Sequence, residues 1–222
     1  MSLTRLGTIA VVAGLAVSAA GGAAMAAKPP KPPGPTLSVG ASTTHVTYGG
    51  AVAIFGRLTG TGSANAPVTL QQAPFPYTRY TNLAGGRTNA LGAYLFGGIH
   101  PGLNTRYRVK AKRVTSANVL VFVRYRVSLG VSDSTPKRGQ GVRFSGIVSP
   151  AANGRLVLIQ RRGSDGRFHT TARALLTLRS ATSSRFSLTK RIFSTGTYRV
   201  RLGADAAHEP GNSRTRRLVV HR

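Results

Sequence analysis

Cysteine and tryptophan are both absent from this chain of 222 residues. Without cysteine the chain cannot form disulfides, zinc–thiolate sites or a cysteine nucleophile, so a hydrophobic core alone must stabilise its folded part. Acidic residues are scarce as well. Only 4 residues are Asp or Glu, whereas 31 are Lys or Arg, and the formal net charge is +27. This balance is far from the usage of ordinary soluble proteins.

The scarcity of carboxylates leaves little material for catalysis. General acid–base and nucleophilic mechanisms need a carboxylate or a histidine beside the reacting group. The four acids lie in the second half of the chain, at Asp133, Asp165, Asp205 and Glu209. Asp205 and Glu209 flank His208, but we favour an exposed loop with solvated side chains, because no nucleophile framed by an oxyanion site lies nearby. We therefore predict no enzyme and no catalytic residue.

Metal and cofactor sites have equally little support. The histidines are scattered, without the short regular spacing that places two ligands side by side; they are His45, His100, His169, His208 and His221. A calcium site needs several negatively charged oxygen ligands, and the segment joining the two halves of the chain has none. We predict no bound metal and no cofactor.

The N-terminus has the features of an export signal. Arg5 precedes an apolar run at positions 6–20, and the triplet Ala24-Met25-Ala26 has the small-x-small pattern that signal peptidase requires. We predict a signal peptide at residues 1–27, and a mature chain that is secreted, extracellular or associated with the cell wall. An uncleaved membrane anchor is the alternative, because the apolar run is nearly long enough to span a bilayer. No second apolar span follows, so we predict no transmembrane segment in the mature chain.

A proline-rich segment follows the signal. Residues 28–35 read KPPKPPGP, which favours an extended polyproline-type linker over a helix or a central strand. We predict a spacer here, in preference to a ligand for a proline-binding module.

An internal repeat predicts the domain organisation. Three separated blocks recur about 90 residues apart. They are YGGAVAIFG and RGQGVRFSG at positions 48 and 138, VTLQ and VLIQ at positions 68 and 157, and YRVK and YRVR at positions 107 and 198. This period is too long for a solenoid unit and close to the size of an immunoglobulin-like sandwich. We therefore predict two β-sandwich domains, at residues 36–124 and 125–222.

Period-two alternation predicts strands and their buried faces. Val52, Ile54 and Leu58 share one face of a strand, while Gly56 on the same face indicates a bulge or a close approach of another backbone. The second copy repeats the pattern with Val142, Phe144, Val148 and Gly146. Glycine-rich and polar segments predict loops, at residues 60–67, 84–86, 163–166 and 209–212. The mature region lacks a long run of helical periodicity, so the predicted fold class is all-β.

The order of the motifs carries a family resemblance. In the first copy YGG, then APVTLQ, then TRYRVKA, and in the second copy RGQGVRFSG, then GRLVLIQRR, then GTYRVRL, are similar to the bacterial immunoglobulin-like modules repeated in secreted and surface proteins of actinobacterial type. The resemblance implies a tandem immunoglobulin-like fold and export, and it implies that the hydroxyls of Tyr107 and Tyr198 close a corner by bonding to the main chain. Both cysteines and the core tryptophan of antibody-type domains are missing, so the resemblance implies no ligand.

Basic residues alternate with buried ones in the last repeated block. Arg106, Arg108, Lys110 and Lys112 alternate with Tyr107, Val109 and Ala111, and in the second copy Arg199 and Arg201 do the same. On a strand, these basic side chains share one outer face, about 6.8 Å apart at successive positions. They are our candidate residues for binding a polyanion. The alternative is a compositional bias that keeps the outer face of a sandwich soluble.

Three functions remain open. The first is a non-catalytic structural or adhesion protein, secreted or on the cell surface, whose partners are other surface proteins. The second is an extracellular protein that binds a cell-wall polymer, an acidic polysaccharide or DNA through the basic face. The third is an accessory protein of an extracellular enzyme. Sequence-specific nucleic-acid recognition is not expected, because no recognition helix is evident. We expect Tyr77 and Tyr80 to form a hydrophobic plug or a β-bulge connection, in preference to a platform for a sugar ring.

Overall fold

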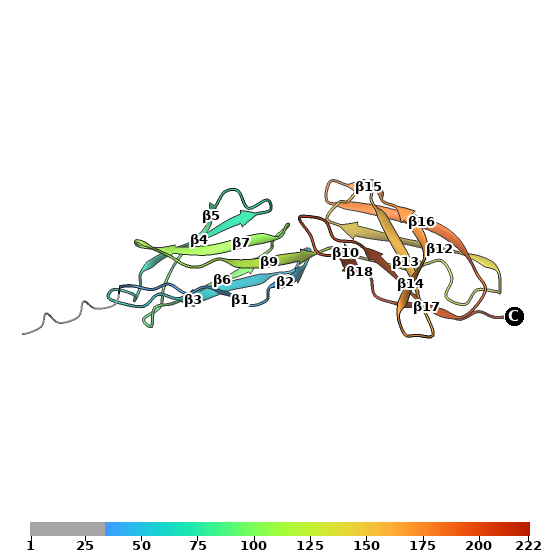
Figure 1. The fold of residues 1–222 in the computed structure, drawn as a ribbon, viewed down its shortest axis with the longest axis horizontal. Coiled ribbons are helices and arrows are strands. Elements are labelled where there is room, and N and C mark those ends of the chain that lie inside the picture. Colours follow the sequence, from blue (N-terminus) through green and yellow to red (C-terminus); the bar gives the residue numbers. More distant parts are fainter. Residues whose placement is uncertain (1–33) are drawn as a thin grey trace, which may run out of the picture. The chain divides into compact units, whose positions relative to one another are not determined.

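The computed structural model describes residues 34–222. The predicted signal peptide and residues 28–33 of the predicted linker lie outside the described part. Within it the chain forms 19 strands and no helix, so the all-β prediction is confirmed (Figure 1). No helix in residues 34–222 has the length and hydropathy needed to cross a membrane.

Residues 37–124 form two sheets that we call the N-terminal sandwich. One sheet has the order β1-β3-β6, and the other has the order β2-β9-β7-β4-β5, with β8 also paired to β7. The strands are β1 Gly40–Ala41, β2 His45–Thr47, β3 Val52–Arg57, β4 Pro67–Pro74, β5 Thr81–Arg87, β6 Ala93–Ile99, β7 Thr105–Ala111, β8 Val114–Thr115 and β9 Val119–Arg124. All pairings are antiparallel except that of β2 with β9.

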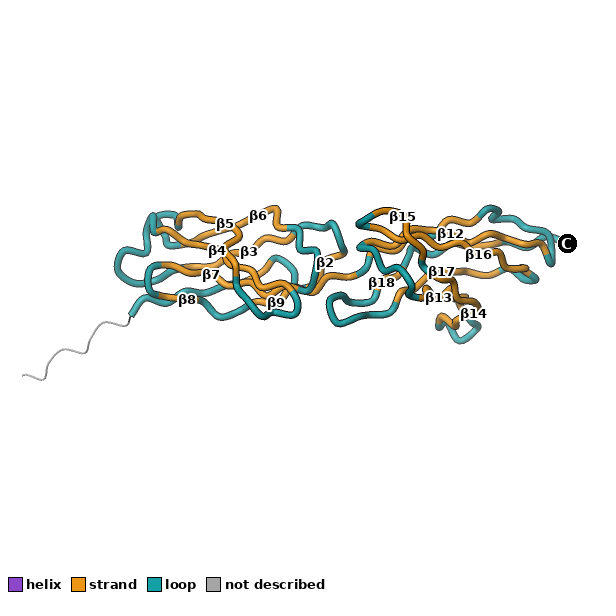
Figure 2. The backbone as a smooth tube through the Cα atoms, turned by 90° about the horizontal axis from the view of Figure 1, so that it is seen from above, coloured by secondary structure: helices purple, strands orange, loops and turns teal. Residues whose placement is uncertain are grey.

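Residues 125–222 form a second pair of sheets, the C-terminal sandwich. One sheet has the order β10-β12-β16-β15, with β11 also on β12, and the other has the order β14-β13-β17-β18, with β19 also on β17 (Figures 1 and 2). The strands are β10 Arg126–Val127, β11 Gly130–Val131, β12 Gln140–Ser149, β13 Leu156–Arg162, β14 Phe168–Leu175, β15 Thr177–Ser180, β16 Ser183–Ile192, β17 Gly196–Leu202, β18 Gly211–Asn212 and β19 Arg216–Leu218. This is the strand order of an immunoglobulin-like sandwich.

Each pair of sheets encloses its own hydrophobic core. The core of the N-terminal sandwich runs in sequence from Leu37 to Val123, and that of the C-terminal sandwich runs from Tyr125 to Leu218. Ile54, Tyr107 and Phe144 have no exposed side-chain area, as the alternation predicts. Because the chain has no disulfides, apolar burial in these two small cores is the main source of stability. That each sandwich is a separate domain stays a prediction.

The repeat extends to individual hydrogen bonds. Ser38 accepts a bond from the Arg57 amide, and Ser128 accepts one from the Ile147 amide, which places the first strand of each copy against the second in the same register. On the last strand, the buried hydroxyls of Ser116 and Ser213 accept bonds from the amides of Val109 and Val200, both at 2.9 Å. These serines satisfy a main-chain donor where the strand is interrupted. The two copies therefore share one detailed architecture.

Gly56 and Gly146 lie where another backbone comes close, as predicted. A Cβ at Gly56 would collide with the carbonyl oxygen of Ser38, and one at Gly146 with that of Ser128. The first strand of each sandwich can approach its neighbour only because these side chains are absent.

Three local predictions are wrong. Gly211 and Asn212, in the predicted loop at residues 209–212, form β18 and pair with β17. Residues 84–86 belong to β5, because Ala84 pairs with Leu70 and the two glycines continue the edge strand. The hydroxyl of Tyr107 is buried without a hydrogen-bond partner in the described structure, so it does not close a corner. Tyr198 packs its ring on Phe144, with 5.3 Å between ring centroids. The likeness to antibody-type domains therefore does not extend to this bond.

The copies differ most in one hairpin. In the N-terminal sandwich, β7 and β8 are joined by Lys112 and Arg113 alone, whereas residues 203–210 join β17 to β18. This longer loop contains Asp205, His208 and Glu209, the candidate acid–histidine cluster.

Candidate anion-binding surface

The outer face of β7 presents basic side chains, as predicted. Arg106 and Lys110 are exposed and Arg108 is half-buried, while Tyr107 and Val109 between them point into the core. β7 lies between β9 and β4, so these cations occupy the middle of a sheet. A cationic face of this kind attracts anions over several ångströms.

Arg108 is held in one orientation by its neighbours. Its Nε donates a 2.9 Å hydrogen bond to Oε1 of Gln71, the residue opposite it on β4. Its guanidinium carbon lies 3.7 Å from the ring centroid of Tyr80, a cation–π contact. Gln71 is fixed in turn by a 2.8 Å bond to Asn82. The terminal nitrogens of Arg108 are thereby positioned without a carboxylate.

The second copy repeats this arrangement. Arg199 Nε donates a 2.9 Å bond to Gln160, and its guanidinium carbon lies 4.0 Å from the ring centroid of Phe168. Partial burial, and then the neighbouring charge of Arg201, lower the pKa of Arg199. Arg199 and Arg201 therefore repel each other, and a bound anion would relieve this repulsion. Gln71 and Gln160 end the repeated VTLQ and VLIQ blocks, which was the only sequence signal for this role.

Lys112 does not continue the row on β7. The strand ends at Ala111, and Lys112 occupies the following turn with φ at 52°. Its ammonium donates a 3.3 Å bond to the carbonyl oxygen of Thr61. The prediction that four basic side chains follow each other on one strand is therefore wrong for the last of them.

Tyr77 and Tyr80 cover arginines and do not form a plug. The guanidinium carbon of Arg106 lies 4.5 Å from the centroid of the Tyr77 ring. The hydroxyl of Tyr80 donates a 2.7 Å bond to Asn118. Both rings are half-buried, so the segment before β5 lies on the outer face of β7 and rigidifies it.

Most basic side chains have no acidic partner. Among residues 34–222, Arg124 and Arg155 are the only Lys or Arg side chains in an ion pair with a carboxylate. The cations of the β7 and β17 faces are therefore neutralised by solvent ions alone. Binding a polyanion would release those ions, which favours association.

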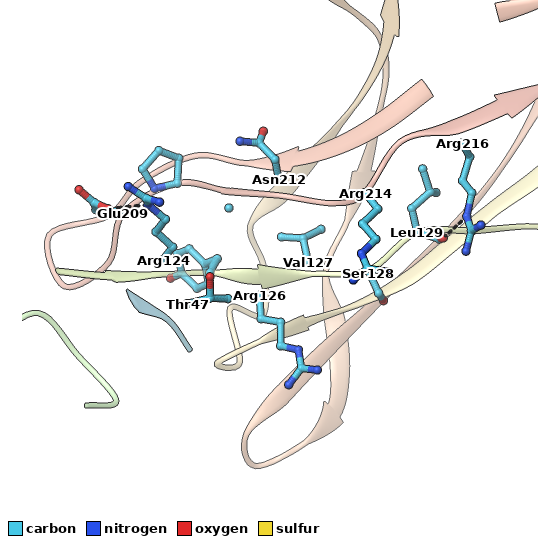
Figure 3. A pocket seen from close by; sticks show the side chains of 13 residues that line it. Thr47, Arg124, Arg126, Val127, Ser128, Leu129, Glu209, Asn212, Arg214 and Arg216 are labelled. Atoms are coloured by element: carbon cyan, nitrogen blue, oxygen red, sulfur yellow. Dashed lines mark hydrogen bonds and ion pairs between the residues drawn. The ribbon is translucent and has the colours of Figure 1, made fainter. Parts of the chain in front are cut away.

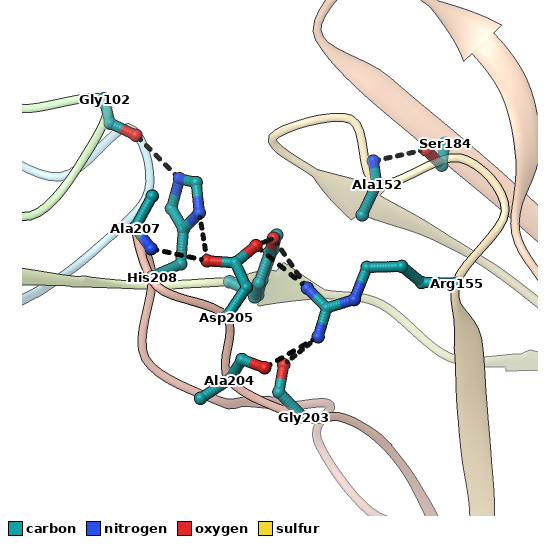
Figure 4. A network of polar contacts seen from close by, with 10 residues as sticks. Gly102, Ala152, Arg155, Ser184, Gly203, Ala204, Asp205, Ala207 and His208 are labelled. Carbon is teal, nitrogen blue, oxygen red and sulfur yellow. Dashed lines mark hydrogen bonds and ion pairs between the residues drawn. The ribbon is translucent and has the colours of Figure 1, made fainter. Parts of the chain in front are cut away.

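The acid–histidine cluster is not a solvated loop, and that prediction is wrong. His208 is 7% exposed. Its Nε2 lies 3.0 Å from the carbonyl oxygen of Gly102, and its Nδ1 lies 3.1 Å from Oδ1 of Asp205 (Figure 4). The ring packs on Tyr125, with 4.7 Å between centroids. The loop folds inward because its polar groups find partners on the preceding copy.

Asp205 is the centre of this network. It accepts bonds from the Tyr125 hydroxyl and from Arg155, the latter at 3.0 Å (Figure 4). Partial burial opposes ionisation of Asp205, but the bonds from Tyr125 and His208 outweigh it and lower the pKa of Asp205. Burial, and then the bond to Asp205, raise the pKa of Tyr125. The Tyr125 hydroxyl therefore remains protonated and donates its hydrogen bond to Asp205. The cluster holds the loop in place against its neighbours.

Glu209 ties the same loop to two further strands. Its Oε2 lies 2.9 Å from Nδ1 of His45 and 3.0 Å from Nε of Arg124. The Glu209 amide donates a 2.8 Å bond to the carbonyl oxygen of Val123. The longer loop of the second copy is thus held to the preceding copy by both side-chain and main-chain bonds. We call residues 203–210 the clamp loop.

Comparison with known proteins finds a weak structural likeness. Neither a protein-family model nor a curated protein matches this chain. Among solved structures it is similar to the crystal structure of a tetra-tandem repeat in the extending region of a large adhesion protein. The likeness covers 83% of this chain and 49% of the other, at 19% identity and a TM-score of 0.37. This chain therefore spans about half the length of that structure, and so weak a likeness carries no functional argument.

The acids and histidines that remain are not arranged as metal ligands. No group of three or more such side chains that could hold a metal ion occurs within residues 34–222. Asp165 and His169 form a separate pair in the β13–β14 hairpin, 2.8 Å apart. The surface charge is consequently the feature with the clearest chemistry.

Proposed function

We propose that this chain is a non-catalytic extracellular or cell-surface adhesion module that binds an anionic polymer. The observation that supports the proposal most is that both copies hold an arginine of the same strand, Arg108 or Arg199, against a glutamine and an aromatic ring. An arginine fixed in this way loses little side-chain entropy when it binds an oxyanion.

A compositional bias explains exposed arginines, but it does not explain their fixed orientation. The contacts of Arg108 with Gln71 and Tyr80 recur with different aromatic residues in the second copy. Neither arginine pairs with a carboxylate, so its charge stays available. Export of the chain and attachment outside the cell are parts of the proposal that rest on the N-terminal sequence.

Binding of the purified chain to a panel of anionic polymers tests this proposal. The face variant carries Arg106→Gln, Lys110→Gln and Arg201→Gln, which are exposed or half-buried cations of the two strands. The charge-matched variant carries Arg138→Gln, Arg167→Gln and Arg191→Gln, three exposed cations elsewhere. We expect the face variant to bind several-fold more weakly than the charge-matched variant. Equal binding by the two, or no binding by the natural chain, would contradict the proposal.

A second candidate is a spacer that holds two sandwiches together. The clamp loop favours it, because the buried His208 and the carboxylate of Glu209 make contacts with the preceding copy. Adhesion and spacing are compatible in one chain.

A further inference from the structure

A groove runs along the open edge of the C-terminal sandwich. It has a volume of about 870 Å³ and lies between β10, at the edge of one sheet, and β18 with the start of β19, at the edge of the other. Figure 3 shows the side chains that line it, which come from these two edges and from the adjoining Thr47, Arg124 and Glu209. A volume of this size accommodates a small ligand or a segment of a polymer.

The groove is lined by cations that lack acidic partners. Arg126, Arg214 and Arg216 line it and are exposed, and none of them pairs with a carboxylate of the described chain. Arg216 reaches across the edge, where its Nε donates a 3.4 Å bond to the carbonyl oxygen of Leu129. The one acid of the lining, Glu209, is already paired with Arg124. The groove therefore has a net positive charge.

The N-terminal sandwich shows that the fold does not need these arginines. The register of the first strand places Thr36 at the position of Arg126, because Leu37 bridges Leu58 as Val127 pairs with Val148. On the last strand, Tyr107 pairs with Val119 just as Tyr198 pairs with Arg216. The same register places Ala117 at the position of Arg214.

The copies thus differ at all three positions: an uncharged residue in the first is an arginine in the second. A uniform bias in composition would place arginines on both edges. The charge is concentrated on the edge that carries the groove.

A second hollow continues the groove. It has a volume of about 480 Å³, shares Arg216 with the groove, and adds Arg217 and the hydroxyl residues Ser132 and Thr215. Asp133 also lines it and accepts hydrogen bonds from Thr135 and Gln140. A track of successive cations along one edge suits an extended ligand with repeated negative charges.

We propose that this groove binds a linear phosphate-bearing polymer, with phosphate groups paired to Arg126, Arg214 and Arg216. The guanidinium group forms paired hydrogen bonds with the two free oxygens of each phosphate in such a chain, and arginine is the preferred side chain for phosphate recognition. This inference rests on the proposed function and specifies its ligand and its principal site. The β7 and β17 faces then add attraction without selecting the ligand.

Isothermal titration calorimetry of the full chain with inorganic polyphosphate tests the inference. The groove variant carries Arg126→Gln, Arg214→Gln and Arg216→Gln, and the charge-matched variant defined above is its control. We expect the groove variant to lose on the order of tenfold or more in affinity for polyphosphate, and the control to lose several-fold less. Both variants lose three positive charges, so a difference between them reports the position of the charges. The single variant Arg214→Gln, whose side chain makes no bond within the fold, keeps the test valid should Arg216→Gln disturb the edge.

The outcomes separate the groove from the proposed function. If the groove variant binds polyphosphate as its control does while the face variant is weakened, the groove inference fails and the proposed function stands. If the natural chain does not bind polyphosphate or any other polyanion, both fail. If polyglutamate binds as tightly as polyphosphate at equal charge, the assignment to phosphate is overturned. Loss confined to the groove variant and to the phosphate polymer supports the inference.

Discussion

Single residues fix the orientation of the cations on the outer faces. Arg108 and Arg199 owe their orientation to Gln71 and Gln160, which lie opposite them because β4 pairs with β7, and β13 with β17, in a particular register. Alternation in the sequence predicted the outward face of the arginines. It could not predict their partners, because a glutamine in a strand carries no sign of which cation it meets.

His208 is the residue whose environment differs most from expectation. Both of its near neighbours, the Gly102 carbonyl and the Asp205 carboxylate, are acceptors, so a proton on either ring nitrogen has a partner. We expect His208→Ala to lower the free energy of unfolding by about 1–3 kcal/mol, because it removes a buried ring together with its two hydrogen bonds. Urea unfolding followed by circular dichroism measures the loss. His221→Ala, at an exposed position, should be neutral, and an equal effect of both changes would refute the role of His208.

Asp205 makes a contribution to stability that depends on pH. Its pKa in the folded chain lies below the usual 3.8, so the folded state holds fewer protons on this carboxyl than the unfolded state does. The contribution is therefore present above the unfolded pKa and is lost as the pH falls through the folded pKa. We expect the urea concentration at the unfolding midpoint to decrease when the pH is lowered below about 4. The decrease should be smaller in the variant Asp205→Asn. An unchanged pH profile in that variant would show that Asp205 is not responsible, whereas Asp133→Asn should keep the Asp205 contribution.

At the scale of the elements, the close approach of the first and second strands limits what the sequence tolerates. Gly56 and Gly97 lie on β3 and β6 of the same sheet, but only the former has a neighbouring backbone within reach of a Cβ. We expect Gly56→Ala to lower the free energy of unfolding by about 1–3 kcal/mol through overpacking. Gly97→Ala should change it little or raise it slightly. Thermal unfolding of the two variants provides the comparison, and equal stabilities would contradict the proposed close approach.

The clamp loop and the groove show which elements sequence patterns miss. The repeated blocks end before residue 203, so the extra residues between β17 and β18 appeared only as a polar loop with turn residues. Their contacts lie on a different part of the chain, at His45, Gly102 and Val123. The groove is formed by strands at the two ends of the C-terminal sandwich, which are adjacent only after folding. Local sequence patterns carry no information about contacts between segments that are distant in the sequence.

At the scale of the whole molecule, the structure shows where part of the net charge of +27 lies. Composition predicted an anionic partner or a bias, and period-two alternation placed part of the charge on outer faces. The described chain adds that most cations lack acidic partners, that two arginines are held by equivalent contacts, and that three more line one edge of the second copy only. These features favour binding over bias.

The dependence of binding on salt tests the central claim most directly. If phosphate groups displace the counterions of the unpaired arginines, the logarithm of the affinity for polyphosphate falls linearly with the logarithm of the salt concentration. We predict a loss of about tenfold or more between roughly 50 and 200 mM salt, with a shallower slope for the groove variant than for the charge-matched variant. An affinity that does not change with salt, or equal slopes for the two variants, would contradict the account.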